Sequence, residues 1–169
     1  MHSVAVDNSG EFIAAGLGGG RVGLWQDAQR TGAFEILHSS HLPGSVESVR
    51  FVSANDSVGG KLTLYAASMK LDGASGGVAA WEIPGFNELF RIPMMGVVDL
   101  AVAQTAGVMA IAQRLDSGRD RGRVTLRDIS GKVVWEQGFR ERVLSVALTN
   151  DAKVVASHTS AGEVEMIGV

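Results

Sequence analysis

Short runs of alternating apolar and polar residues cover most of the chain, and 22 glycines interrupt them at short intervals. Successive side chains of a β-strand point to opposite faces of a sheet, so an alternation with a period of two predicts strands. Residues 4–6 and 49–51 show this alternation. No segment has the apolar spacing that is typical of an amphipathic helix. The pattern predicts an all-β chain.

A block of the form Gly-x-Val-x-x-bulky repeats along the sequence, at 20–25, 76–81, 122–127 and 162–167. The last positions of these copies are 25, 81, 127 and 167, which lie 56, 46 and 40 residues apart. One four-stranded blade of a β-propeller takes about 40 to 50 residues. The repeat therefore indicates four blade-like modules, with this block as the third strand of each.

Three further elements recur around the block. A small polar residue followed by apolar alternation predicts inner strands at 3–6, 48–51, 99–102 and 145–148. After turn-forming residues, runs rich in alanine and large apolar residues predict second strands at 11–17, 61–68, 107–113 and 153–158. Outer strands are predicted at 33–38, 87–92 and 132–137. Each module reads as an inner, a second, a third and an outer strand.

The whole chain is predicted to be one β-propeller repeat domain of four antiparallel modules, at approximately 1–40, 41–93, 94–138 and 139–169. The last module ends after its third strand and lacks the outer one. Propellers close with about four to eight blades, so we expect a half or partial propeller that leaves an apolar blade face open at each end. It would assemble with a second chain or belong to a longer polypeptide. A closed four-bladed ring is the alternative.

Residues 20–27, Gly-Arg-Val-Gly-Leu-Trp-Gln-Asp, resemble the third strand of a WD-repeat blade, which typically ends on tryptophan-aspartate. Residues 4–16 are similar to the first two strands of such a blade. Residues 128–135, with Gly-Lys-x-x-Trp, look more like the repeat of pyrroloquinoline-quinone-type propellers. The Gly-His dipeptide of WD repeats is missing, and Arg127 and Ile167 replace the tryptophan. The resemblance implies a propeller superfamily, without a specific protein.

The composition narrows the classes of function. A net charge of −3 lacks the basic excess that nucleic acid binding usually needs. The absence of cysteine excludes disulfides, cysteine–zinc sites and thiol nucleophiles. No apolar run is long enough for a membrane helix, and Met1 is followed at once by a predicted strand in place of a signal peptide. We therefore expect a cytoplasmic protein that binds neither nucleic acid nor membrane.

Catalytic chemistry is not indicated, and we expect no enzyme, metal or cofactor. His38 and His41 are the only closely spaced histidines, and we expect both to be solvent-exposed in the loop entering the second module, because no further ligands lie nearby in the sequence. The glycine-rich segment 16–20 lacks the lysine and the helix of a phosphate loop, so we expect a flexible hairpin loop. Residues 131–135 match only the structural part of the quinone-type repeat.

The loops on one rim of the propeller are predicted to be modestly basic. These loops join second to third strands and consecutive modules. The candidate partner-binding residues on this rim are Lys70, Arg91, Arg114, Arg119, Arg121, Arg140 and Arg142. The acidic residues among them are Asp72, Asp116, Asp120 and Glu141. Because loops on rigid scaffolds often carry binding, the polar segment 114–121 is the preferred contact.

The sequence favours a protein-interaction or scaffold module whose rim meets a protein partner, or which associates with itself to complete the propeller. A ligand-binding or enzymatic propeller with a site in the central channel is an alternative, as is a purely structural subunit of a larger assembly. The inner strands offer few polar groups for a channel site: Ser3, Ser48, Arg50, Asp99 and Ser145.

Overall fold

A computed structural model describes residues 3–27, 35–53, 61–70, 76–103, 105–115 and 121–169. It contains 15 strands arranged in four separate antiparallel sheets, three of four strands and one of three. A three-residue 3₁₀ turn, Gly18–Gly20, connects the second and third strands of the first sheet. The all-β prediction is confirmed.

The first two sheets contain eight strands in sequence order. The first sheet consists of β1 (Ser3–Val6), β2 (Phe12–Gly16), β3 (Arg21–Gln26) and β4 (Glu35–His41). The second sheet consists of β5 (Ser45–Ser53), β6 (Leu62–Met69), β7 (Gly76–Ile83) and β8 (Asn87–Met94). Each strand pairs with the one before it in the chain, as expected of a propeller blade.

The last two sheets differ by one strand. The third sheet consists of β9 (Val97–Ala103), β10 (Val108–Arg114), β11 (Gly122–Asp128) and β12 (Val133–Phe139). The fourth sheet consists of β13 (Val143–Leu148), β14 (Val154–Thr159) and β15 (Val164–Gly168). Within the described residues nothing pairs with the outer edge of β15, as the missing outer strand predicts.

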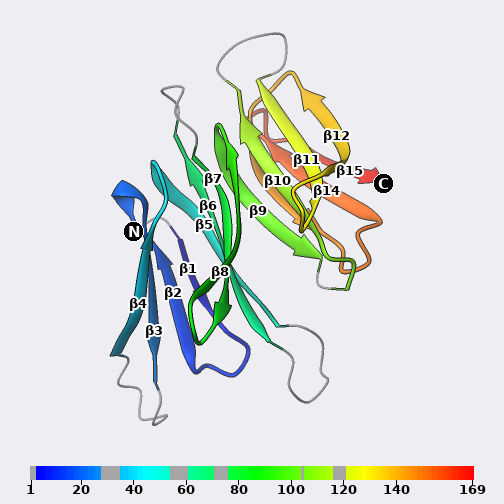
Figure 1. Cartoon of the computed structure of the whole chain (residues 1–169). Helices are drawn as coiled ribbons and strands as arrows, with labels where there is room; N and C mark the ends of the chain where they lie inside the picture. Colours follow the sequence, from blue (N-terminus) through cyan, green and yellow to red (C-terminus); the bar gives the residue numbers. More distant parts are fainter. Residues whose placement is uncertain (1–2, 28–34, 54–60, 71–75, 104, 116–120) are drawn as a thin grey trace.

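The four sheets stand side by side in a row, with the N-terminus at one end and the C-terminus at the other (Figure 1). Their inner strands β1, β5, β9 and β13 are consecutive neighbours. Each sheet therefore contacts the sheets before and after it in the chain, and β1 and β13 are the two ends of the inner series. This is an open array of blades, the partial propeller that the sequence predicts.

The core lies between the sheets. We call the face of a sheet that packs on the following sheet its front, and the face that packs on the preceding sheet its back. Val22 and Leu24 on the front of the first sheet pack with Val46 and Leu64 on the back of the second. Two more clusters join the second sheet to the third and the third to the fourth. A sheet without neighbours would expose the apolar side chains of its faces to water. Each sheet therefore depends on the adjacent sheets for its stability.

Glycine is required at the corner that leads from the first sheet to the second. Gly20 has φ +81°, in the left-handed region that other residues rarely adopt. A Cβ at this position would overlap the carbonyl oxygen of Leu42. The backbones approach this closely because the Leu42 N–H donates a hydrogen bond of 2.8 Å to the Gly20 carbonyl. The predicted flexible hairpin loop is thus a short, hydrogen-bonded 3₁₀ turn.

The turn between β1 and β2 is organised by a buried carboxylate. Asp7 accepts hydrogen bonds from the Ser9 hydroxyl, the Ser9 N–H and the Phe12 N–H. Burial acts to raise the pKa of Asp7, but these hydrogen bonds favour the charged form and hold it below its ordinary value of 3.8. In the equivalent turn between β13 and β14, hydrogen bonds from the Thr149 hydroxyl and from Lys153 lower the pKa of Asp151 to about 2.

We expect Asp7 to make the fold sensitive to acid. Because the pKa of Asp7 is lower in the folded than in the unfolded chain, its contribution to stability is complete at neutral pH. It is lost as the pH falls below 3.8 through the folded-state pKa. Asp7→Asn keeps one of the two acceptor oxygens and has no titrating proton. Its free energy of unfolding should therefore be lower at neutral pH but decline less steeply between pH 5 and pH 3. Urea unfolding at several pH values tests this, and equal slopes in both proteins would contradict it.

Candidate functional site

The structure places five of the seven predicted basic residues at or beside the predicted rim. Lys70 follows β6, Arg114 ends β10 and Arg121 precedes β11, while Arg140 and Arg142 lie in the loop between β12 and β13. Lys70 and Arg114 are partly buried, whereas the other three side chains are exposed. Of these five residues, the three with exposed side chains therefore lie where the third and fourth sheets meet. Arg119 lies outside the described residues, as do Asp72, Asp116, Asp120 and most of the predicted contact segment 114–121.

Arg91 does not lie in a rim loop, where the sequence predicts it. It lies within β8, opposite Ala79 of β7, and is not in a loop. Its guanidinium makes a 2.6 Å ion pair with Glu88 and donates a 3.2 Å hydrogen bond to the carbonyl of His41. The hydrogen bond from Arg91 lowers the pKa of Glu88 and raises the pKa of Arg91 itself. The side chain thus links the outer strands β4 and β8. The sequence could not show this, because the alternation does not reveal how neighbouring blades contact.

Arg121, Arg140 and Arg142 form the rim cluster. Backbone hydrogen bonds hold the loops that carry them: the Arg121 N–H donates to the Phe139 carbonyl at 2.9 Å, and the Ser160 N–H donates to the Arg142 carbonyl at 2.8 Å. Two loops of the third sheet and one of the fourth are therefore tied together. The three arginines thus extend into solvent from hydrogen-bonded backbone.

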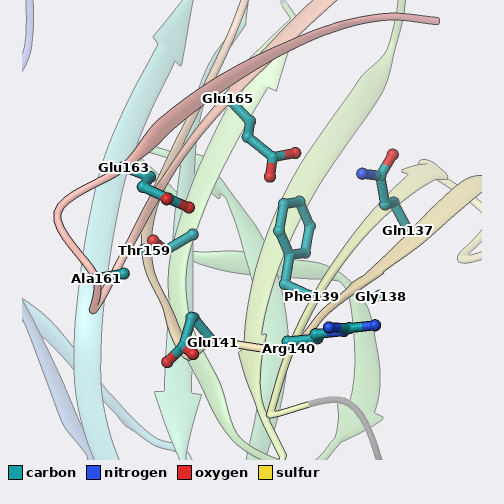
Figure 2. Close-up of a pocket in the computed structure, with 9 residues that line it drawn as sticks. All are labelled: Gln137, Gly138, Phe139, Arg140, Glu141, Thr159, Ala161, Glu163 and Glu165. Atoms are coloured by element: carbon teal, nitrogen blue, oxygen red, sulfur yellow. The ribbon is translucent and has the colours of Figure 1, made fainter.

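A groove lies next to the rim cluster, between the end of β12 and the β14–β15 hairpin, with a volume of about 420 Å³. Figure 2 shows the Phe139 ring inside it, with Glu163 and Glu165 on one side and Gln137 on the other. Arg140 belongs to both the groove and the rim cluster. The remaining lining residues are Gly138, Glu141, Thr159 and Ala161.

The groove lies beside β15, the last strand of the fourth sheet. In each of the other sheets a fourth strand pairs with the third, whereas the outer edge of β15 has no paired strand among the described residues. An unpaired edge presents N–H and C=O groups that can accept another strand. Three carboxylates beside one arginine make the groove acidic, in contrast to the basic rim next to it. The sequence pattern shows that the outer strand is missing, but it does not show the groove beside β15.

Three of the five polar residues predicted on the inner strands, Ser3, Arg50 and Asp99, join neighbouring sheets. The Ser3 hydroxyl accepts a 3.1 Å hydrogen bond from the Val49 N–H of the second sheet. Asp99 accepts one of the same length from the Val146 N–H of the fourth sheet, and its other oxygen pairs with Arg50 of the second at 3.3 Å. Asp99 therefore connects three consecutive inner strands. These groups act in the packing of the blades, which weakens the case for a ligand site in the channel.

The predicted exposed loop around His38 is wrong. His38 and His41 lie in β4, because the outer strand runs three residues further than predicted, to His41. The His38 ring is partly buried and stacks on Phe86 of the next sheet, with centroids 5.4 Å apart, and Phe86 in turn stacks on Trp81 at 5.2 Å. His38 is thus a packing residue, while His41 is exposed. In the part of the chain that the structure describes, no three acidic or histidine residues are grouped so as to hold a metal ion.

Comparisons with solved structures identify the fold. The Dos1 propeller aligns with 99% of this chain at a TM-score of 0.75 and 15% identity, and the chain covers 44% of it. A chain in the crystal structure of the mitotic checkpoint complex aligns with 99% of this chain at a TM-score of 0.76 and 14% identity, with 50% of that chain covered. Identities this low show the fold alone. The protein has the β-propeller fold and spans about half the length of these two chains.

No protein-family model and no curated protein matches the sequence. Among the described residues, no helix has the length and apolar character needed to cross a membrane.

Proposed function

We propose that this protein is a non-enzymatic protein-interaction module that presents the rim between its third and fourth sheets to an acidic surface of a protein partner. The observation that supports the proposal most directly is the rim cluster, in which Arg121, Arg140 and Arg142 are exposed on loops tied together by backbone hydrogen bonds. A set of positive charges carried by an ordered backbone attracts a complementary negative surface and orients it. Arginine is also enriched at protein interfaces, where its planar guanidinium binds carboxylates.

The two solved structures are consistent with this role, since one of them is a propeller-like chain within the mitotic checkpoint complex, an assembly of proteins. That association belongs to the other protein, and it supports only the general use of such blades in assemblies. The groove beside the rim adds a second contact of opposite charge. A partner that places acidic side chains on the rim cluster and a basic or extended segment along Glu163 and Glu165 would match both.

The double variant R140E/R142E tests the proposal. Both residues are exposed on the loop between β12 and β13, so the fold should be unaffected while the charge of the rim is reversed. We expect at least a tenfold loss of the bound partner when the immobilised variant and the wild type are compared in quantitative affinity capture from cell extract, because reversed charges at an interface repel the partner.

The matched control is Lys153→Glu. Lys153 is exposed at the turn between β13 and β14, at the opposite end of the fourth sheet from the rim cluster. It should retain the partner. Equal capture by the wild type and both variants would contradict the proposal, and so would a captured species that nuclease removes.

A further inference from the structure

The two ends of the row of sheets expose positions that are buried everywhere else. On the front of the third strands, Val22, Val78 and Val124 occupy the same position of the repeat and are fully buried. Val164 occupies this position in β15 and is 68% exposed. The difference has a simple cause, since the first three sheets each have a following sheet and the fourth has none among the described residues.

The neighbouring front position shows the same contrast. Leu24, Ala80 and Leu126 are buried in the first three sheets, whereas Met166 is 80% exposed in the fourth. Leu144 and Val154 extend the exposed apolar surface onto β13 and β14. The front of the fourth sheet thus exposes an apolar surface, whereas the fronts of the first three sheets bury theirs against the following sheet.

The opposite end exposes the complementary surface. On the back of the inner strands, Val49, Leu100 and Val146 are buried against the preceding sheet. Val4 occupies this position in β1 and is 52% exposed. Val6 and Ile36 are also exposed on the first sheet. One chain therefore has an open front at its C-terminal end and an open back at its N-terminal end.

We infer that the open front of the fourth sheet binds the open back of the first sheet of a second copy of this chain. Three front-to-back contacts within the chain already bury the same repeat positions, so the new contact continues an interface that the protein forms with itself. Two copies related by a twofold axis would make two such contacts and place eight modules in one ring, within the range at which propellers close. The alignments with solved structures agree with a ring of two copies, because one copy covers 44% of one similar propeller chain and 50% of the other.

The inner strands supply a polar counterpart to this contact. Ser3 and Asp99 each accept a hydrogen bond from the backbone N–H of the next sheet, on Val49 and Val146 respectively. The equivalent Ser48 hydroxyl is buried without such a bond among the described residues. Ser145 holds this position in the last sheet, and Val4 is the counterpart of Val49 and Val146. In the closed ring the Ser145 hydroxyl would accept a hydrogen bond from the Val4 N–H of the second copy.

Light scattering behind size exclusion and sedimentation equilibrium, over a range of protein concentrations, test the inference. We expect the wild type to have twice the mass of one chain. Met166→Asp should raise the dissociation constant by about a hundredfold or more, because it places a charge inside both contacts. Met166 is exposed within one chain, so the substitution should leave the fold intact. The control Met95→Asp makes the same change at a 51% exposed methionine outside both open faces and should keep the dimer.

A mixing experiment establishes which faces meet. Val4→Asp blocks the back and Met166→Asp blocks the front, so each variant alone should be a monomer. A mixture of the two should regain a dimer through the one contact that has neither charge. Val4→Asp dimers on their own would show that fronts bind fronts, and would overturn the inference.

Ser145→Ala should raise the dissociation constant by roughly tenfold, because the dimer loses the two hydrogen bonds that the Val4 N–H groups donate to the Ser145 hydroxyls. A wild type that is monomeric at all concentrations would overturn the inference. Both open faces would then be covered by further blades of a longer polypeptide. The contact does not depend on the rim: R140E/R142E changes neither open face and should remain dimeric, so failure of this inference and failure of the proposed function are distinguishable.

Discussion

Trp81→Ala is expected to lower the free energy of unfolding by about 3–5 kcal/mol, the usual cost of removing a fully buried aromatic side chain. Trp81 is only 2% exposed and lies on the back of the second sheet, in the cluster with the front of the first. It also stacks on Phe86, whose backbone has φ +53°. The substitution would leave a cavity between two sheets and remove a contact that holds Phe86 in this unfavourable conformation.

The repeat provides a matched control for Trp81. Trp25 holds the same position in the first sheet, but its face is open and its side chain is only partly buried. We expect Trp25→Ala to cost about 1 kcal/mol in the single chain, since the ring loses fewer contacts. Urea unfolding followed by far-UV circular dichroism at low protein concentration gives both values. Equal losses at the two positions would mean that the ends of the row are covered within one chain.

Gly20→Ala should be at least as damaging, with an expected loss of more than about 3 kcal/mol, because two penalties combine. A side chain at φ +81° strains the backbone, and the new methyl group would overlap the Leu42 carbonyl. Relief of that overlap requires the turn to move away from the loop that enters the second sheet. This would also disturb the hydrogen bond from the Leu42 N–H.

Gly10→Ala separates these two penalties. Gly10 has φ +72°, close to the value at Gly20, but a Cβ there would meet no atom within 4 Å. We expect Gly10→Ala to lower the free energy of unfolding by about 1–2 kcal/mol, because only the left-handed backbone conformation is strained. Thermal unfolding of the two variants and the wild type measures the difference. Equal destabilisation would show that the close approach to Leu42 contributes nothing.

The strands and their order could be predicted from the sequence because local pattern determines them. The Gly-x-Val block marked the third strand of every sheet, and a small polar residue followed by apolar alternation marked the inner strand. Strand ends were less accurate: β4 continues to His41, beyond the predicted end at His38. Its last residues pair with β3, and register with a neighbouring strand, not local composition, decides where such a strand ends.

The candidate site was predicted in part, for a physical reason. The positions of Arg140 and Arg142 in a loop followed from the strand order. The ion pair and hydrogen bond of Arg91, the stacking of His38 and the groove beside β15 did not, because each depends on how one sheet packs against the next. The alternation shows which side of a strand is apolar. It does not show which residues of another module lie opposite.

The front and the back of each sheet differ, so the row of blades has a direction. The chain is therefore a building unit with two different ends, a head and a tail. A unit whose head binds its own tail forms a closed ring only if the rotation per unit divides a full circle; otherwise it grows as an open helical fibre. The strength of the contact does not decide between these products, because the same contact occurs in both. The twist between consecutive sheets decides it. A substitution that changes the twist without weakening the contact would convert a finite assembly into a filament.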